Sequence, residues 1–146
     1  MEIKIDNLLI SDDKSLLNHE IIYDFMQRSY WANKRSEEKI YRSIENSICF
    51  GVYDDKQQVG FARVVTDFAT MYWLCDVYID EDYRGRGIGR KLIGAITSSP
   101  DLKDLFGYLG TKDAHTLYEQ YGFTQEQEKL MSRMPDFLRS DNTLNN

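Results

Sequence analysis

The sequence lacks a long apolar segment, a large set of cysteines and histidines, and an excess of positive charge. Its longest uninterrupted apolar run, Met71 to Cys75, is far shorter than the roughly 18 residues that a membrane-spanning helix needs. The N-terminal residues 2–7 are charged and contain no apolar segment of the kind that directs export. We therefore expect no membrane association and a cytoplasmic location.

Cysteine and histidine are both scarce, with two of each in 146 residues. Cys49 and Cys75 lie inside apolar runs with the character of strands, where a buried reduced thiol is common. His19 and His115 have no Cys or His partner at the spacing of metal ligands. The sequence gives no support for a metal site, and we interpret the two cysteines as packing residues.

Positive charge is also in short supply, because 24 acidic residues outnumber 18 basic ones and the net charge is −6. A protein that binds nucleic acid through its phosphates needs a broad basic face. Nucleic acid is therefore disfavoured as the main partner. The negative charge weakly favours a cationic substrate.

The length of 146 residues and the hydrophobic content of 42% fit one domain with one sizeable core. We place that domain at residues 1–138 and expect a polar tail over 139–146. Apolar periodicity and turn residues predict the elements inside it. In chain order these are a strand over 2–10, helices over 14–28 and 36–46, strands over 47–53, 58–67 and 71–80, a helix from 88 that stops at Pro100, a strand over 105–111, a helix over 114–121 and a strand over 129–134.

This order predicts an α/β protein with a mixed, mostly antiparallel central sheet flanked by helices. Three consecutive strands between residues 47 and 80 are joined by short polar loops, which favours antiparallel neighbours. The stretch from Met71 to Thr111 is a strand, a helix and a strand, and this pattern is typical of a parallel crossover connection.

A glycine- and arginine-rich segment, RGRGIGRK, follows the fourth predicted strand and leads into a helix. At such a junction the free N–H groups and the positive end of the helix dipole favour an anion. Glycines let the backbone approach the anion closely, and guanidinium groups add contacts suited to phosphate. The segment therefore predicts a pyrophosphate site, built from Gly85, Gly87 and Gly89 with Arg84, Arg86, Arg90 and Lys91 around them.

The glycine spacing G-x-G-x-G matches neither of two common phosphate-binding patterns. A P-loop carries G-x-x-x-x-G-K-[ST], and a dinucleotide-binding fold carries G-x-G-x-x-G directly after its first strand. On the turn alone, a tight connection surrounded by solvated arginines remains an equal alternative.

Two segments together carry a family resemblance. The stretch VYIDEDYRGRGIGRKLI, residues 77–93, is a strand that ends in an acidic turn and continues as R-x-x-G-x-G. The stretch AHTLYEQYGF, residues 114–123, has an alanine and a tyrosine four positions apart, followed by glycine and phenylalanine. Both resemble motifs of the GNAT acyltransferases, stand at the expected separation, and fit an element order that covers nearly the whole chain. The chain is thus similar to a single-domain, bacterial-type GNAT N-acetyltransferase.

The resemblance implies transfer of an acetyl group from acetyl-CoA to a primary amine of a small molecule or peptide, by direct attack in a ternary complex and without a metal. It implies that backbone groups of a strand hold the pantetheine and that the glycine turn holds the pyrophosphate. It leaves open whether the protein is a monomer or a homodimer. The residues expected to bind acetyl-CoA are Cys75, Val77, Tyr78, Ile79, Arg84, Gly85, Arg86, Gly87, Ile88, Gly89 and Arg90.

Tyr118 matches the tyrosine that, in many members of this superfamily, protonates the departing thiolate of CoA. Acid catalysis by a positioned side chain typically contributes about 10²- to 10⁴-fold to a rate, so this role would matter. The alternative is that Tyr118 belongs to the apolar face of its helix and only packs in the core.

The general base is less determined by the resemblance. Met71 and Thr111 stand where some members of the superfamily carry a glutamate and an asparagine. Asp67, Asp76 and His115 are left as candidates to take the proton from the amine. Each of them could instead pair with Arg63 or with another charged group.

The acceptor should lie against the two N-terminal helices and the loop between them, as the resemblance implies. Tyr30 and Trp31 could form an aromatic wall there, although ordinary packing of the loop is an equal alternative. Two other functions stay open. One is a non-catalytic acyl-CoA-binding regulatory module, favoured by the missing glutamate. The other is a nucleic-acid- or protein-binding domain that uses RGRGIGRK as a basic patch, which the net charge disfavours.

Overall fold

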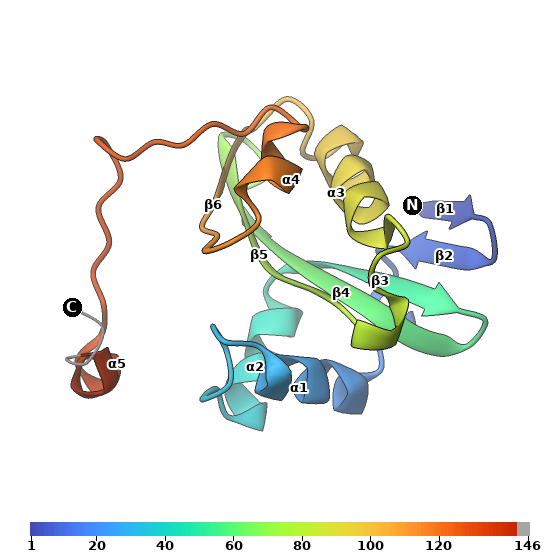
Figure 1. Cartoon of the computed structure of the whole chain (residues 1–146), viewed down its shortest axis with the longest axis horizontal. Helices are drawn as coiled ribbons and strands as arrows, with labels where there is room; N and C mark the ends of the chain where they lie inside the picture. Colours follow the sequence, from blue (N-terminus) through green and yellow to red (C-terminus); the bar gives the residue numbers. More distant parts are fainter. Residues whose placement is uncertain (143–146) are drawn as a thin grey trace.

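The computed structural model describes residues 1–142, and in them one twisted sheet lies between helices (Figure 1). The strands follow the chain order across the sheet, and neighbours are antiparallel except for the last pair, which is parallel. This arrangement confirms the predicted mixed, mostly antiparallel sheet. The strands of the described part are β1 (Glu2–Ile5), β2 (Leu8–Ser11), β3 (Ile48–Asp54), β4 (Gln57–Thr66), β5 (Met71–Ile79) and β6 (Phe106–Leu109).

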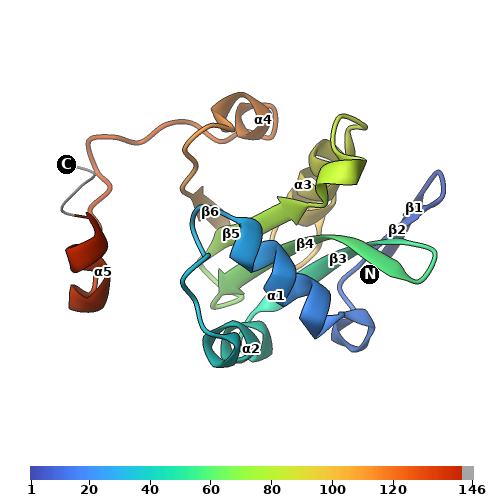
Figure 2. The ribbon, with the colours of Figure 1, turned by 60° about the horizontal axis from the view of Figure 1, so that its bottom comes forward.

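Helices cover both faces of the sheet, as the view from below makes clear (Figure 2). Helices α1 and α2 lie on one face, and α3 and α4 lie on the other. The helical bounds are α1 (His19–Arg28), α2 (Glu37–Glu45), α3 (Ile88–Ser98), α4 (His115–Glu119) and α5 (Asp136–Asn142), with short 3-10 turns η1 (Lys14–Leu16) and η2 (Glu81–Tyr83).

Each face of the sheet carries its own apolar core. Leu92 and Ile96, one turn apart on α3, are completely buried against Val52 of β3 and other residues of that face. Ile22 and Phe25 on α1 are buried with Phe61 of β4 on the opposite face. Since burying one such side chain contributes roughly 1.5 to 3 kcal/mol, the two cores fix both helical layers onto the sheet.

The N-terminal segment departs from the sequence prediction in two places. The single strand expected over 2–10 is wrong, because Asp6 adopts a left-handed φ of 53° and turns the chain into the hairpin of β1 and β2. The helix expected from residue 14 begins only at His19, because the side chain of Asn18 caps it by accepting the N–H of Ile21 at 3.1 Å. The start expected for the helix over 36–46 is confirmed, because Ser36 caps α2 by accepting the N–H of Lys39.

The C-terminal segment departs further. The strand expected over 129–134 is wrong, because these residues form a turn and an irregular stretch that stands away from the sheet (Figure 1). Helix α5 follows and crosses the expected boundary at 138/139. The last tail residues, 143–146, lie outside the described residues, and the division into domain and tail stays a prediction. No helix in residues 1–142 is long and apolar enough to cross a membrane, and the cytoplasmic location stays a prediction.

Candidate functional site

Strands β5 and β6 pair along only part of their length. Their parallel register runs from Met71 opposite Phe106 to Leu74 opposite Leu109, where β6 ends. Strand β5 continues to Ile79, and no other strand of residues 1–142 pairs with it on that side. The second half of β5 therefore has one open edge.

A β-bulge determines which backbone groups face this open edge. The register between β5 and β4 shifts around Asp76, which has a left-handed φ of 55°. Beyond it, the N–H of Asp80 donates to the carbonyl of Val59 on β4 at 2.9 Å. Because backbone groups alternate along a strand, those of Val77 and Ile79 point away from β4 and into the open edge. The bulge thus presents two residues that the sequence assigned to the pantetheine.

The other two strand residues assigned to acetyl-CoA lie differently. Tyr78 is buried, and its ring stacks on Phe25 of α1 at 5.0 Å. Cys75 is half-buried opposite Arg63 of β4, and burial raises the pKa of its thiol to about 11. The Cys75 thiol therefore stays protonated at neutral pH, which fits the packing role predicted for it.

The glycine turn after η2 has the backbone that an anion site requires. Gly85 and Gly87 have φ values of 80° and 76°, and no atom lies within 4 Å of the position that a Cβ would take at either residue. Gly87 precedes α3, and no side chain of the described residues caps the N–H groups of its first turn. Gly89 and the buried Ile88 lie inside that turn. An open, uncapped helix start without acidic residues fits a pyrophosphate.

Two arginines flank the turn and are oriented by backbone carbonyls. The Nε of Arg84 donates to the carbonyl of Ile79 at 2.9 Å, and Nη2 of Arg86 donates to the carbonyl of Asp82 at 3.2 Å. The Arg86 guanidinium also lies over the Tyr83 ring, 4.8 Å from its centroid. Both side chains remain exposed, so their positive charges stay beside the turn. Arg90, further along α3, is exposed as well.

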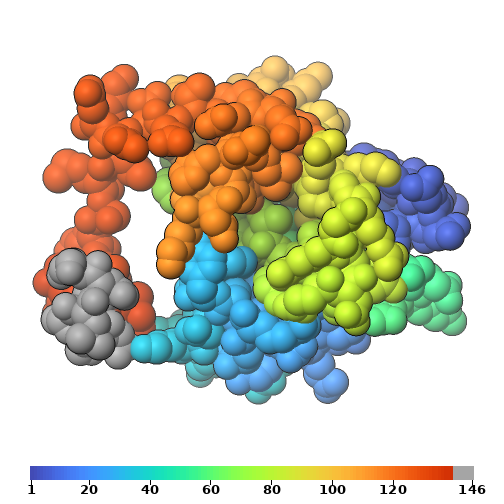
Figure 3. Space-filling model, viewed as in Figure 1, coloured from blue at the N-terminus to red at the C-terminus, as the bar shows by residue number. Residues whose placement is uncertain are grey.

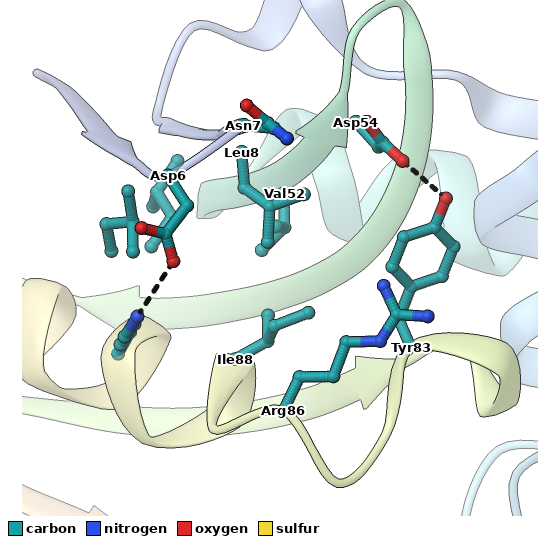
Figure 4. A pocket seen from close by; sticks show the side chains of 11 residues that line it. Asp6, Asn7, Leu8, Val52, Asp54, Tyr83, Arg86 and Ile88 are labelled. Atoms are coloured by element: carbon teal, nitrogen blue, oxygen red, sulfur yellow. Dashed lines mark hydrogen bonds and ion pairs between the residues drawn. The ribbon is translucent and has the colours of Figure 1, made fainter.

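A cavity of about 190 Å³ adjoins the turn on the side of the β1–β2 hairpin (Figure 4). Apolar side chains of the hairpin and of β3 form its wall, with Arg86 at its rim. Lys91 pairs with Asp6 at 3.7 Å, and the Tyr83 hydroxyl donates to Asp54 at 2.6 Å. Lys91, expected from the sequence beside the phosphates, therefore points toward the hairpin.

Tyr118 is buried in α4, with 9% of its surface exposed, and its ring packs edge-on against Phe123. Its hydroxyl has no hydrogen-bond partner within residues 1–142. Burial, with smaller contributions from the neighbouring Tyr30 and Asp113, raises the pKa of the phenol to about 12. The hydroxyl is therefore protonated at neutral pH. His115 is half-buried in the first turn of the same helix.

The α1–α2 loop reaches the loop before α4. The hydroxyl of Tyr30 accepts the N–H of Lys112 at 3.2 Å, and the Tyr30 ring packs edge-on against Trp31 at 4.9 Å. Figure 3 shows a hollow that is bordered by this loop, by α4 and by the turn after η2, with strand residues at its floor. The structure thus brings the predicted acceptor residue Tyr30 close to the predicted acid Tyr118.

Asp76 is the centre of a buried cluster beneath that loop. Its Oδ1 accepts the Nε1–H of Trp31 at 3.0 Å, and its Oδ2 accepts from Arg35 and Arg63, each at 2.8 Å. Arg63 also donates to Ser47. Burial alone would raise the pKa of Asp76, but the two guanidinium groups outweigh it and hold the pKa below its usual value.

Asp67 lies apart from this cluster, in the exposed loop that precedes β5, whereas the open edge is at the end of β5. Its carboxylate accepts the N–H groups of Ala69, Thr70 and Met71 and the Thr70 hydroxyl. These hydrogen bonds, that of the Thr70 hydroxyl first, hold its pKa far below the usual range. Both aspartates therefore have their oxygen atoms engaged.

Sequence reasoning missed Arg35 and Lys112. Arg35 lies 41 positions from Asp76 and Lys112 lies 82 positions from Tyr30. Neither residue belongs to a motif, so only the folded chain connects them to the site. The pairing of a candidate aspartate with Arg63 was weighed from the sequence, and the structure contains it for Asp76.

An acetyltransferase (GNAT) domain model matches residues 45–125, more than half of the chain. The chain belongs to the GNAT family. Its predicted family and fold are thereby confirmed. Among the described residues, no group of three or more His, Cys, Asp or Glu side chains is arranged to hold a metal ion.

Solved structures and a curated relative agree with this assignment. A chain from Xanthomonas campestris pv. campestris, named as a GNAT-family acetyltransferase candidate, is 38% identical, with a TM-score of 0.86 over 94% of this GNAT chain and 99% of that one. A Gibberella zeae protein with an acetyltransferase name is 29% identical in an alignment of length 105 that covers 58% of this chain and 59% of that protein. This chain thus spans about three-fifths of that relative.

A more distant structure was solved with acetyl-CoA bound. That chain, from Clostridium acetobutylicum, is named an acetyltransferase and is 14% identical, with a TM-score of 0.63 over 87% of the present chain and 95% of that one. At this identity the likeness is one of fold.

Proposed function

We propose that this GNAT protein transfers the acetyl group of acetyl-CoA to a primary amine of a small-molecule or peptide acceptor, by direct attack in a ternary complex. The observation that carries the proposal is one hollow bordered by the uncapped glycine turn after η2, by the α1–α2 loop and by α4, the helix that carries Tyr118, with strand residues at its floor. A phosphate site alone would suit many ligands. A phosphate site next to an unpaired strand edge suits a ligand with both a pyrophosphate and an amide-containing arm.

The residues proposed to hold acetyl-CoA act mainly through their backbones. The turn from Arg84 to Gly89 would take the pyrophosphate, and the backbone groups of Val77 would take the pantetheine amides. The carbonyl of Ile79 already accepts from Arg84, so we assign the pantetheine contacts chiefly to Val77. When bound, acetyl-CoA supplies the activated thioester.

Tyr118 is proposed as the general acid. As the amine nitrogen forms its bond to the carbonyl carbon and the C–S bond breaks, Tyr118 donates its phenolic proton to the sulfur. A phenol whose pKa is raised to about 12 carries that proton throughout the neutral range. Its hydroxyl, without a partner in residues 1–142, is free to donate.

The general base is assigned by asking which of the three candidate side chains already make hydrogen bonds or ion pairs. The Asp76 carboxylate accepts hydrogen bonds from two guanidinium groups and an indole, and the Asp67 carboxylate accepts hydrogen bonds from its own loop. The imidazole of His115 makes no hydrogen bond or ion pair within residues 1–142, and His115 lies three positions before Tyr118 on α4. We therefore assign to His115 the removal of the amine proton, and to Asp76 the positioning of the acceptor loop through Trp31 and Arg35.

The test is release of CoA thiol from acetyl-CoA across a panel of polyamines, amino acids, aminoglycosides and peptide N-termini, with mass spectrometry of the product. We expect acceptor-dependent thiol release and a gain of one acetyl group on nitrogen. Saturable acetyl-CoA binding without turnover on any amine would favour a non-catalytic acyl-CoA-binding regulatory module. Salt-dependent binding to oligonucleotides without CoA binding would favour a nucleic-acid-binding domain.

A further inference from the structure

The buried cluster around Asp76 carries more positive than negative charge. Two guanidinium groups, those of Arg35 and Arg63, donate to the same oxygen of the Asp76 carboxylate, each at 2.8 Å. The other oxygen accepts the indole N–H of Trp31. Within residues 1–142, no second carboxylate forms an ion pair with either arginine. One carboxylate therefore faces two guanidinium groups, and one positive charge is left without a partner.

The unmatched charge lies where a ligand can reach it. The side chain of Asp76 is only 3% exposed and that of Arg63 is 12% exposed, whereas that of Arg35 is 31% exposed. Among the described residues, Nη1 is the one side-chain nitrogen of Arg35 that makes a hydrogen bond. A guanidinium has several N–H donors in a planar fork that matches a carboxylate. Arg35 can therefore hold Asp76 with one donor and take a second carboxylate with others.

The sheet surface beside Arg63 is apolar and aromatic. Arg63 of β4 lies opposite Cys75 of β5. Two positions along, Val65 lies opposite Trp73, so these four side chains share one face of the sheet. Trp73 is half-buried, and Trp31 of the α1–α2 loop is 39% exposed. A ligand bound at the arginines therefore also meets apolar and aromatic groups.

The loop before α4 places charges of both signs at the border of the same hollow. The Lys112 ammonium lies 5.5 Å from the centroid of the Tyr30 ring. Asp113 contributes to the raised pKa of Tyr118, so its carboxylate lies toward the proposed acid. Positive charge is thus found beside the α1–α2 loop, and negative charge is found toward Tyr118. This polarity suits a ligand whose amine points to Tyr118 and whose anionic group points to Arg35.

We propose that the acceptor is a primary amine that also carries a carboxylate, of the amino-acid or short-peptide class, and that Arg35, assisted by Arg63, binds this carboxylate. The inference rests on the proposed acetyl transfer and names the acceptor class for the same hollow. A second carboxylate would balance the charge of the cluster. The net charge of the chain, −6, weakly favours a cationic substrate, but a bound ligand meets the local charge. Polyamines and aminoglycosides would bring further cations against Arg35.

Paired acceptors test the proposal, because amidation removes the carboxylate charge and keeps the rest of the molecule. CoA thiol release is measured with amino acids and dipeptides, each beside its C-terminal amide, and with spermidine, all at equal concentrations of unprotonated amine. For the best acceptor, kcat/KM should be about 100-fold higher for the acid than for the amide, since a charge-assisted contact is lost. Spermidine should be the poorest. Equal values for acid and amide in every pair, or the highest value for spermidine, would overturn the proposal.

Arg35→Gln removes the unmatched charge and keeps a donor for Asp76. The ratio of acid to amide in kcat/KM should fall to about 1, because Arg63 and Asp76 then balance each other. Arg35→Lys keeps the charge and should retain part of the preference. Arg42→Gln is the matched control, because Arg42 on α2 is 76% exposed and pairs with Glu38, so the preference should stay. If Arg35 only held the loop, KM would rise equally for acid and amide, and an unchanged ratio in folded Arg35→Gln would refute its role.

Binding measurements separate this inference from the proposed reaction. Calorimetry in the presence of CoA gives the affinity of the protein for the N-acetyl form of each acid and of its amide, and it needs no turnover. Selective binding of the N-acetyl acids without acetylation of any amine would refute the reaction and support the carboxylate site. Acetylation of amines with equal rates and equal product affinities for acids and amides would support the reaction and refute the carboxylate site.

Discussion

The turn proposed to hold the cofactor and the loop proposed to face the acceptor are built by different means. The turn is a short local segment in which Gly85 and Gly87 expose the backbone and no side chain caps the helix. The loop is held by side chains distant in sequence, since Trp31 reaches Asp76 across 45 positions. One region therefore depends on bare backbone, and the other depends on a buried cluster of charges. Mutations in the turn should therefore lower acetyl-CoA affinity, whereas mutations in the cluster should lower stability and raise the acceptor KM.

The largest expected effect is on the turn. Gly87→Val puts a branched side chain at a φ of 76° and fills the space at the helix start, so acetyl-CoA affinity should fall by about 1,000-fold or beyond detection. Isothermal titration calorimetry measures it. Gly122→Val is the matched control, because Gly122 has a φ of 88° and equally open surroundings, but lies outside the turn. Equal affinity losses in both variants would mean that strain, not the anion site, is responsible.

The next effect is on turnover rather than on binding. Tyr118→Phe keeps the buried ring and deletes a hydroxyl without a partner in residues 1–142, so kcat should fall by roughly 100-fold while stability and CoA affinity stay near wild type. Tyr121→Phe is the matched control, because the Tyr121 hydroxyl donates to the carbonyl of Arg90 at 2.7 Å. That variant should lose about 1 kcal/mol of stability and keep its kcat. An unaltered kcat in folded Tyr118→Phe would remove Tyr118 as the acid.

The contrast between a local turn and a cluster of residues distant in sequence also explains what could be predicted from the sequence. The turn was found because its glycines lie within five residues of one another, and the crossover from β5 to β6 was found because its apolar pattern is local. The buried cluster around Asp76 was only partly predicted. Arg35 belongs to no sequence motif, and only folding brings it to Asp76. The turn at Asp6 was missed because apolar residues typical of strands stand on both sides of it. The strand over 129–134 was wrongly predicted because its apolar pattern is only local, and these residues pair with no strand of residues 1–142.

Asp76→Asn tests the proposed role of the Asp76 cluster in positioning the α1–α2 loop. Asparagine tolerates the left-handed φ of Asp76, so the bulge should persist while the charge is lost. Leaving Arg35 and Arg63 without their buried carboxylate should cost on the order of 3 kcal/mol of stability and raise the acceptor KM about 10-fold, with CoA affinity nearly unchanged. Steady-state kinetics and urea unfolding measure the two effects.

Asp67→Asn is the control for that variant, because Asp67 is exposed and serves only its own loop. It should leave kcat and KM within about 2-fold of wild type. If Asp76→Asn instead lowered kcat at saturating acceptor while KM and stability stayed unchanged, Asp76 would return as the base. If Asp67→Asn lowered kcat, the base would be Asp67.

The smallest expected effect is a pH dependence that belongs to Tyr118. Its pKa is about 12 in the folded protein and about 10 in the unfolded chain, so the unfolded state loses its proton first as pH rises. The stability linked to this group is complete below pH 10 and falls between pH 10 and 12. At pH 11 the loss amounts to about 1.4 kcal/mol.

Urea unfolding of wild type and Tyr118→Phe at pH 8 and pH 11 isolates this contribution. Both proteins lose stability in alkali, because burial also raises the pKa values of Cys49 to about 11 and of Tyr53 to about 12. The variant lacks the phenol, so its loss should be smaller than that of wild type by about 1.4 kcal/mol. Parallel losses would mean that Tyr118 ionises as readily in the folded protein as in the unfolded chain. In that case the phenol would not be held in a dry site, and its assignment as a protonated donor facing the thioester would lose its physical basis.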